Sequence, residues 1–190
     1  MPNTVPTSLF LTGGARSGKS RLAQEWILAG PAPHVYLATA QTRHDDAEMQ
    51  ARIARHQADR AGHGWTTREC STDVAGAITG AGAGAVVIDC VTLWLCALGE
   101  RHAWVEAPIL VEIDRLAALL AAPPCDVAVV SNEVGSGIVP GDALSRGFQD
   151  LQGFANQRLA AAAHAAALVV AGLPLWLKRP TGLRPIPGTA

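Results

Sequence analysis

The stretch Gly13-Gly14-Ala15-Arg16-Ser17-Gly18-Lys19-Ser20 fits the pattern G-x-x-x-x-G-K-[ST], which is the sequence of a P-loop. An apolar run, Leu9 to Leu11, precedes it, and a helix-compatible run, Arg21 to Leu28, follows it. A strand, a glycine-rich loop and a helix, in that order, are the context that a P-loop requires. The pattern therefore predicts a loop that binds the phosphates of a nucleoside triphosphate. The alternative is a glycine-rich surface turn with an exposed lysine.

The residue types of this loop explain how it would hold phosphate. Glycines let backbone N–H groups approach phosphate oxygens closely, and the positive end of the following helix dipole points at the anion. Lys19 is expected to reach the β- and γ-phosphates, and the Ser20 hydroxyl is expected to ligate Mg²⁺. The predicted phosphate contacts are Gly13, Gly14, Ala15, Arg16, Ser17, Gly18, Lys19 and Ser20.

Composition favours a single domain over residues 1–190, because this length can bury a core but seldom holds two. The net charge of −1 gives no indication of a nucleic acid or an anionic membrane as partner. The most apolar region, 159–177, is interrupted by His164, Gly172 and Pro174, so no membrane span is predicted. The N-terminus does not resemble a signal peptide, and the four cysteines form no C-x-x-C pair. Reduced thiols in a cytoplasmic protein are therefore expected.

Apolar strands and helical segments alternate along the chain. Continuous apolar strands separated by helices indicate a doubly wound α/β fold with a mostly parallel sheet, helices on both faces, and ligands at the carboxyl ends of the strands. A C-terminal hairpin and flexible tails over 1–7 and 180–190 are also predicted. The predicted strands are Ser8–Thr12, His34–Thr39, Gly64–Arg68, Ala85–Asp89, Asp126–Ser131, Ala167–Ala171 and Leu175–Leu177. The predicted helices, besides Arg21–Leu28, are Ala47–Arg60, Val74–Gly84, Pro108–Leu120 and Leu144–Ala166.

Two features after the P-loop point to the same edge of the predicted sheet. Asp89 ends an apolar strand, where P-loop proteins place the acid that holds Mg²⁺, although it also suits the cap of a turn. The loop from Ser131 to Pro140 follows another strand, and its glycines, amide and carboxylate suit substrate recognition as well as an ordinary connection. Spacing alone leaves open whether Asn156-Gln157-Arg158 faces that edge or solvent.

His56 lies with Met49 and Ile53 on one face of the helix predicted over Ala47–Arg60. From spacing alone, such a histidine is more often a packed core residue than a catalytic group. However, arginines make the neighbouring helix edge cationic, which suits a triphosphate, and a neutral imidazole can attack phosphorus and hold a nucleotidyl group as a phosphoramidate. These arginines are Arg52, Arg55 and Arg60. Both interpretations of His56 stay open on spacing.

Two longer runs are more specific than the P-loop. They are Asp46-Ala47-Glu48-Met49-Gln50-Ala51-Arg52-Ile53-Ala54-Arg55-His56 and Asn132-Glu133-Val134-Gly135-Ser136-Gly137-Ile138-Val139-Pro140. Together with the P-loop, Tyr36–Thr39, Trp65–Glu69 and Asn156–Ala160, in this order, they resemble the bifunctional adenosylcobinamide kinase/adenosylcobinamide-phosphate guanylyltransferases of cobalamin biosynthesis. The resemblance covers nearly the whole chain, apart from the first residues and the tail over 180–190.

The resemblance implies a RecA-like P-loop fold, a homotrimer and two reactions. First, ATP or GTP, with Mg²⁺ as counter-ion, phosphorylates the hydroxyl of the aminopropanol arm of adenosylcobinamide. Second, GTP guanylylates a histidine and releases pyrophosphate, and the phosphorylated corrinoid takes GMP to give adenosylcobinamide-GDP. His56 matches the histidine of the family, and Lys19 serves both steps. The nucleotide contacts implied outside the P-loop are Ala38, Thr39, Ala40, Gln57, Ala58, Asp59, Arg60, Glu69 and Asp89.

Two residues depart from the pattern of the family. Asp89 stands where glutamate is common, which changes the reach of the carboxylate, and Ala40 stands where serine is common, which removes a hydroxyl. Two other functions stay open on the residues: a P-loop small-molecule kinase in which His56 is structural, and a nucleotide-dependent switch that binds a protein. Transfer of label from α-labelled GTP to the protein separates the bifunctional enzyme from both.

Overall fold

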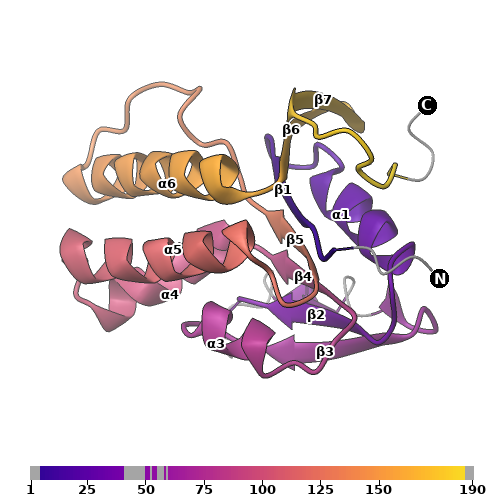
Figure 1. The fold of residues 1–190 in the computed structure, drawn as a ribbon. Helices are drawn as coiled ribbons and strands as arrows, with labels where there is room; N and C mark the ends of the chain where they lie inside the picture. The colour runs from indigo at the N-terminus through magenta and orange to yellow at the C-terminus, as the bar shows by residue number, and fades with distance from the viewer. Residues whose placement is uncertain (1–4, 41–49, 52, 55–57, 59, 187–190) are drawn as a thin grey trace.

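The computed structural model describes residues 5–40, 50–51, 53–54, 58 and 60–186. These residues form an α/β fold around one sheet (Figure 1). The strands are β1 Ser8–Thr12, β2 His34–Ala38, β3 Trp65–Glu69, β4 Ala85–Asp89, β5 Asp126–Val130, β6 Ala165–Val170 and β7 Leu173–Lys178. The helices are α1 Lys19–Leu28, α3 Val74–Thr79, α4 Val91–Arg101, α5 Glu106–Ala121 and α6 Ala143–Ala162. The helix predicted at Ala47–Arg60 lies largely outside the described residues.

The strands of the sheet follow the order β3-β2-β4-β5-β1-β6-β7. All neighbouring pairs are parallel except β6 and β7, which form an antiparallel hairpin. Helix α1 covers one face of the sheet, and α4, α5 and α6 cover the other (Figure 1). The predicted α/β fold, with its mostly parallel sheet, helices on both faces and C-terminal hairpin, is therefore confirmed.

The register brings one residue from each of five strands into a single row at the carboxyl edge of the sheet. Ala38 pairs with Glu69 on one side and with Asp89 on the other. Asp89 pairs with Val130, which pairs with Leu11, two residues before the P-loop. Because neighbouring strands lie about 4.8 Å apart, Asp89 lies about 10 Å from β1 across the sheet, and Glu69 lies about 19 Å from it.

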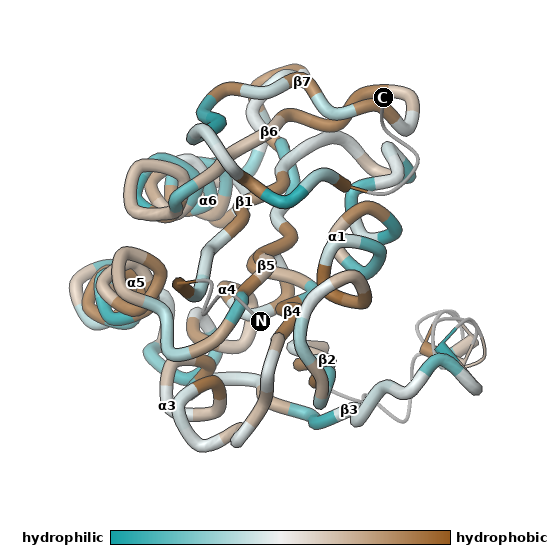
Figure 2. The backbone as a smooth tube through the Cα atoms, turned by 45° about the vertical axis from the view of Figure 1, so that its right-hand side comes forward, coloured by the Kyte–Doolittle hydropathy of each residue, from teal (hydrophilic) through white to brown (hydrophobic). Residues whose placement is uncertain are grey.

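The central strands are apolar except at their ends, because both of their faces are covered (Figure 2). Side chains alternate between the two faces of a strand. Phe10 and Val129 pack in the core formed with α4, α5 and α6, whereas Leu9 and Leu11 pack in a second core with Trp26 of α1. Burial on both faces fixes the register, and the register in turn fixes the row of residues at the carboxyl edge.

Helix α4 occupies residues 91–101, for which the sequence patterns predict no helix. Its buried residues do follow helical spacing, namely Val91, Trp94, Leu95 and Leu98. Apolar side chains at Leu93 and Cys96 fill other faces of the helix and obscure that period, because a continuous apolar run does not distinguish a helix from a buried strand. Helix α3 is also shorter than predicted, since it ends at Thr79.

The boundary between α6 and β6 corrects the helix predicted over Leu144–Ala166. Helix α6 ends at Ala162, and β6 begins at Ala165, two residues before the predicted strand. The alanine-rich sequence has no local signal for the end of the helix at this point. A long-range contact marks it instead, because the Ser8 hydroxyl lies 2.8 Å from Nδ1 of His164 and accepts a hydrogen bond from the His164 backbone N–H at 3.0 Å.

Both predicted tails are partly packed. Arg184 Nη1 donates to Asp126 Oδ2 at 2.8 Å, and Arg184 Nη2 donates to the carbonyl oxygen of Trp26 at 2.9 Å. The Thr7 N–H donates to the other oxygen of Asp126 at 2.8 Å. The mobile tail over 180–190 stays a prediction, although Asp126 and Trp26 bind the guanidinium of Arg184. Residues 187–190 lie outside the described chain.

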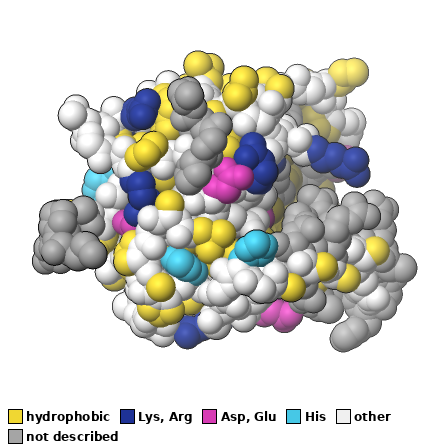
Figure 3. Space-filling model, turned by 90° about the vertical axis from the view of Figure 1, so that its right-hand side faces the viewer, with side chains coloured by type: hydrophobic (Ala, Val, Ile, Leu, Met, Phe, Trp, Pro, Cys, Tyr) yellow, Lys and Arg dark blue, Asp and Glu magenta, His cyan; other side chains and the backbone are white. Residues whose placement is uncertain are grey.

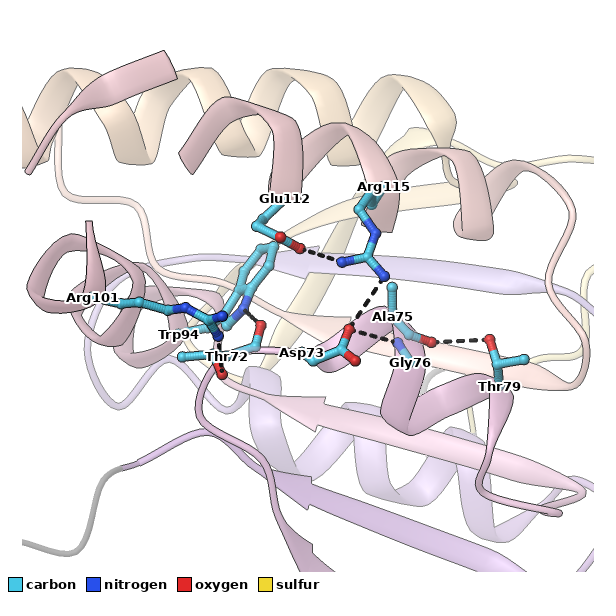
Figure 4. Close-up of polar contacts among 9 residues, drawn as sticks. All are labelled: Thr72, Asp73, Ala75, Gly76, Thr79, Trp94, Arg101, Glu112 and Arg115. Carbon is cyan, nitrogen blue, oxygen red and sulfur yellow. Dashed lines mark hydrogen bonds and ion pairs between the residues drawn. The ribbon is translucent and has the colours of Figure 1, made fainter. Parts of the chain in front are cut away.

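Polar contacts hold the start of α3 against α4 and α5 (Figure 4). Asp73 caps α3 by accepting a hydrogen bond from the Gly76 N–H at 3.1 Å, and Arg115 of α5 lies 3.4 Å from the same carboxylate. The indole N–H of Trp94 donates to the carbonyl oxygen of Thr72 at 2.8 Å. These contacts tie three helices of one face together next to the carboxyl edge of β3.

Candidate active site

The P-loop connects β1 to α1 at the carboxyl edge of the sheet. Gly18 is the N-cap of α1 in a left-handed conformation, with φ of 97°, and no side chain caps the helix. The first turn of a helix has N–H groups without acceptors inside the helix, which makes it a site for an anion. The start of α1 is therefore open to an anion, and binding of phosphate by this loop stays a prediction.

Two neighbouring segments, at Glu133 and at Gly172, hold the P-loop in place. The Gly13 carbonyl accepts a hydrogen bond from the Glu133 N–H at 3.1 Å, and the Ser17 carbonyl accepts one from the Gly172 N–H at 2.8 Å. Lys19 is only 7% exposed, and its Nζ donates to the Gly14 carbonyl at 2.9 Å. The lysine is thus held across the loop, with its ammonium at the Gly14 carbonyl.

We expect Gly13→Ala to destabilise the protein strongly and Gly14→Ala to leave it nearly unchanged. A Cβ at Gly13 would lie 2.4 Å from the Val169 carbonyl oxygen, whereas a Cβ at Gly14 meets nothing within 4 Å. The added Cβ must push β6 away from the P-loop. This should lower the free energy of unfolding by about 2–3 kcal/mol in Gly13→Ala, against about 0.5 kcal/mol in Gly14→Ala. Urea denaturation measures both values. Equal stability of the two variants would contradict the geometry of the loop.

Asp89, Tyr36 and Arg60 form a cluster next to the carboxyl edge of β2 and β4. The Tyr36 hydroxyl donates to Asp89 Oδ2 at 2.8 Å, and the guanidinium carbon of Arg60 lies 3.6 Å from the centre of the Tyr36 ring. Arg60 is only 6% exposed, yet its Nε and Nη1 have no hydrogen-bond partner in the structure described. Because buried N–H groups are nearly always paired, these two donors indicate a place for an anionic ligand.

The environment of this cluster raises the pKa values of Tyr36 and of the adjacent Cys90. Burial, and then the charge of Asp89, raises the pKa of Tyr36 well above its usual range, so the hydroxyl stays protonated and continues to donate to Asp89. Burial raises the pKa of the Cys90 thiol to about 11, and Asp89 adds to the shift. Cys90 is therefore a neutral thiol at physiological pH rather than a nucleophile.

The predicted nucleotide-contact segment Ala38-Thr39-Ala40 lies beside Asp89, but the hydroxyl of Thr39 makes its hydrogen bonds within the protein. Its hydroxyl accepts a hydrogen bond from the Cys90 N–H and donates to the Cys90 carbonyl, both at 2.7 Å, and the residue is fully buried. Thr39 thus fixes the chain immediately after Asp89. Ala38 and Ala40 are half-buried, and Glu69 is exposed at the end of the edge strand β3.

A buried network of amides joins the end of β5 to α6. The Ser131 hydroxyl donates to Asn156 Oδ1 at 2.6 Å, and Gln152 Nε2 donates to the Ser131 hydroxyl at 2.9 Å. Asn156 Nδ2 donates to the Asn132 carbonyl at 3.0 Å, and Asn132 Nδ2 donates to the Thr92 hydroxyl at 2.7 Å. The loop after β5 is therefore attached to both α6 and α4 beside the P-loop, on the edge where the sequence predicts it.

The network also answers which residues of the Asn156–Arg158 run face the site. Asn156 faces it, Gln157 is exposed, and Arg158 Nη1 lies 2.8 Å from Asp114 on the surface of α5. Sequence reasoning assigned no role to Gln152. Its position one helical turn before Asn156, which puts two amides on one face of α6, is the signal that identifies it.

The structure places the P-loop and Asp89 at the carboxyl edge of the sheet and Arg60 against Tyr36, but three predicted residues cannot be placed with them. His56, Gln57 and Asp59 lie outside the described residues, and Ala58 is exposed. The described residues include no group of three or more His, Cys, Asp or Glu side chains positioned to hold a metal ion. None of the described helices has the length and hydrophobicity needed to span a bilayer.

A P-loop that opens a helix at the carboxyl edge of a mostly parallel sheet, with an acidic residue on a strand of the same edge, defines a P-loop protein of the RecA-like class. Within that class, this chain belongs to the family described as cobinamide kinase / cobinamide phosphate guanyltransferase, which matches residues 9–177.

Three relatives align along nearly their whole length. The bifunctional adenosylcobalamin biosynthesis protein CobU of Salmonella typhimurium is 43% identical over 90% of this chain and 99% of its own. CobP of Pseudomonas aeruginosa is 38% identical over 89% and 96%, and CobU of Escherichia coli is 38% identical over 90% and 99%. A solved structure of an ATPase from a type III secretion system aligns at a TM-score of 0.45 with 14% identity, over 86% of this chain and 51% of that one.

Proposed function

We propose that this protein phosphorylates adenosylcobinamide and then converts the product to adenosylcobinamide-GDP. The observation that carries the proposal is the P-loop at the carboxyl edge, with Lys19 buried across it and Asp89 in the same row of the sheet. Membership of the family supplies the identity of the acceptor and the second reaction. The three relatives are named as bifunctional proteins of adenosylcobalamin biosynthesis, which agrees with both steps.

In the first step, the hydroxyl oxygen of the aminopropanol arm attacks the γ-phosphorus of ATP or GTP. The new O–P bond forms as the bond from the γ-phosphorus to the bridging oxygen breaks, so a nucleoside diphosphate leaves and the hydroxyl proton passes to solvent. Lys19 and the N–H groups at the start of α1 stabilise the negative charge on the transferring group. The product is adenosylcobinamide phosphate.

In the second step, a ring nitrogen of His56 attacks the α-phosphorus of GTP. An N–P bond forms as the bond between the α-phosphorus and its bridging oxygen breaks, and pyrophosphate leaves. A phosphate oxygen of adenosylcobinamide phosphate then attacks the same phosphorus and displaces His56, which gives adenosylcobinamide-GDP. The first step breaks the β–γ link and the second breaks the α–β link, so GTP must bind in two registers or the segment that carries His56 must move.

The remaining predicted residues are assigned to the nucleotide and its metal ion. Mg²⁺ would be held by Ser20 and Asp89, because this ion takes one or two protein oxygens together with phosphate and water. It would supply positive charge that neutralises the phosphates of the nucleotide. The two unpaired donors of buried Arg60 support its contact with the anionic nucleotide. Further nucleotide contacts are assigned to Ala38, Thr39, Ala40, Gln57, Ala58, Asp59 and Glu69.

A homotrimer in the cytoplasm is part of the proposal. Hydrophobic side chains gather over the β6–β7 hairpin at the top of the face in Figure 3. Along β7, Leu173, Leu175 and Leu177 are 67%, 61% and 62% exposed, and such a row on an edge strand suits contact with another copy. The four cysteines, all in the described part of the chain, are thiols, which suits a reducing compartment. Light scattering should give the mass of three chains, and a single-chain mass would contradict the trimer.

Product analysis tests the proposed function. The protein is incubated with adenosylcobinamide, GTP and Mg²⁺, and the corrinoids are separated and identified by mass spectrometry. We expect adenosylcobinamide phosphate to appear first and adenosylcobinamide-GDP to follow, with pyrophosphate released in equal amount. If only adenosylcobinamide phosphate accumulated, the protein would be a kinase without guanylyltransferase activity. Recovery of unchanged adenosylcobinamide would refute both steps.

A further inference from the structure

A mainly apolar cavity of about 400 Å³ lies between α4, the first half of α6 and the loop that joins β5 to α6. Its walls include two aromatic side chains, Trp104 and Phe148, and the aliphatic side chains Val134, Ile138 and Leu144. Ser145 and Gln149 supply polar groups to its lining. Neither reaction step described above uses this cavity.

The cavity lies beyond the carboxyl edge of the sheet, which is also the edge of the P-loop. Helix α6 reaches this edge at Gln152, which bonds to Ser131 at the end of β5. The buried residues of α6 begin at Leu151, whereas Leu144 and Ser145 are exposed. At 1.5 Å per residue, Ser145 lies about 10 Å along the helix from Gln152, so the first half of α6 extends past the sheet.

One wall of the cavity is built by an unfavourable turn. Ala103 and Trp104 both adopt left-handed conformations, with φ of 50° and 60°, which cost energy for residues other than glycine. The turn places the Trp104 ring edge-on to Phe148 at 6.2 Å. The ring also covers Gly99 so closely that a Cβ there would lie 2.5 Å from it. The fold thus fixes a large aromatic surface at the cavity wall.

The opposite wall is attached to the P-loop. Glu133 donates its N–H to the Gly13 carbonyl at 3.1 Å, and the next residue, Val134, lines the cavity. Gln149 Nε2 donates to the Val134 carbonyl at 2.9 Å, which joins this wall to α6. A molecule in the cavity would therefore lie one residue away from the segment that supports the phosphate loop.

We infer that this cavity binds one edge of the corrin ring of the acceptor substrate, with the aminopropanol arm directed toward the P-loop. The inference rests on the proposed function, which supplies a corrinoid as acceptor. The rim of a corrin ring carries methyl groups and amide side chains, which match apolar walls with an amide and a hydroxyl. Ile138 and Val139 are 97% and 72% exposed on the same loop, so they offer apolar surface to the part of the ring that extends outside.

The test uses a tryptophan that fills the cavity and a matched tryptophan that does not. Ser145 is exposed and lines the cavity, and Asp142 caps α6 through the backbone N–H of Ser145, which Ser145→Trp retains. Asp150→Trp adds the same side chain at an exposed position of α6 outside the lining. Binding of adenosylcobinamide is measured by equilibrium dialysis through its visible absorption, and labelling by α-labelled GTP is measured on the same samples.

We expect Ser145→Trp to raise the dissociation constant for adenosylcobinamide at least tenfold and Asp150→Trp to change it less than twofold. Both variants should keep wild-type labelling by GTP, because nucleotide binding does not involve the cavity. Ile138→Asp, a change at a residue that supports no core contact, should weaken corrinoid binding as well.

If Ser145→Trp and Ile138→Asp both bound the corrinoid with wild-type affinity and turned it over, this inference would be overturned. The proposed function would then still stand. Failure of the wild-type protein to bind or turn over adenosylcobinamide would overturn the proposed function and the inference together. A change in mass by light scattering for Ser145→Trp, without a change in corrinoid affinity, would show a contact between subunits at this cavity and would also overturn it.

Discussion

Replacing His56 with alanine should abolish the covalent attachment of GMP to the protein. The imidazole nitrogen is the proposed nucleophile, and alanine offers no atom that can form the N–P bond. We expect labelling by α-labelled GTP to fall at least about a thousandfold, which is the scale of loss when a nucleophile is removed. The label on the wild-type protein should be lost in acid and retained in alkali, as for a phosphoramidate.

A matched histidine variant separates this effect from a general loss of structure. His63 is exposed and lies in the turn before β3, so His63→Ala should label like the wild-type protein. The kinase step should survive in His56→Ala, because that step needs no histidine nucleophile. A His56→Ala variant that still accepts GMP would remove His56 from the mechanism and leave the P-loop assignment intact.

Replacing Lys19 with alanine should impair both reactions. Lys19 is 7% exposed and donates to the Gly14 carbonyl, which holds its ammonium over the loop. Loss of this charge removes stabilisation from the transferring phosphate in either register. We expect kcat/KM for both steps to fall about a thousandfold, equivalent to about 4 kcal/mol of transition-state stabilisation.

Lys19→Met serves as the packing control because it keeps most of the buried side chain and removes only the charge. Steady-state kinetics with GTP and adenosylcobinamide should show the same loss in Lys19→Met as in Lys19→Ala. If Lys19→Met retained wild-type kcat/KM, the lysine would act through packing, and the phosphate role would be wrong. Unchanged GTP affinity in both variants would refute the P-loop interpretation itself.

The fold follows from the sequence wherever local pattern and burial agree. The strands that end at Thr12, Asp89 and Val130 have continuous apolar interiors, and such strands are typical of a sheet that is covered on both faces. The P-loop pattern then fixes the carboxyl edge and the start of α1. These features predict Lys19 and Asp89 on the same edge of the sheet.

One error is local, because Leu93 and Cys96 hide the helical period of α4. The other errors arise where tertiary contacts decide the local structure. Contacts between Ser8 and His164, rather than the alanine run, set the end of α6. The tail around Arg184 is held by Asp126, a residue 58 positions away in sequence. No window of neighbouring residues contains these partners.

Sequence reasoning also found the charged residues of the candidate site more readily than their supports. Motifs singled out Asp89 and Arg60, but not the Tyr36 hydroxyl that bonds Asp89 or the Tyr36 ring beneath Arg60. The support by Gln152 depends on the geometry of α6 against β5. The position of His56 relative to the P-loop stays a prediction, because the residue lies outside the described structure.

The central claim is that one site transfers a γ-phosphoryl group and, separately, a guanylyl group. It is tested most directly with two samples of GTP, one labelled at the α-phosphorus and one at the γ-phosphorus, each incubated with the wild-type protein and adenosylcobinamide. We predict that γ-label enters adenosylcobinamide phosphate, and that α-label appears on the protein and then in adenosylcobinamide-GDP. Transfer of γ-label to the corrinoid with no α-label on either protein or corrinoid would contradict the account.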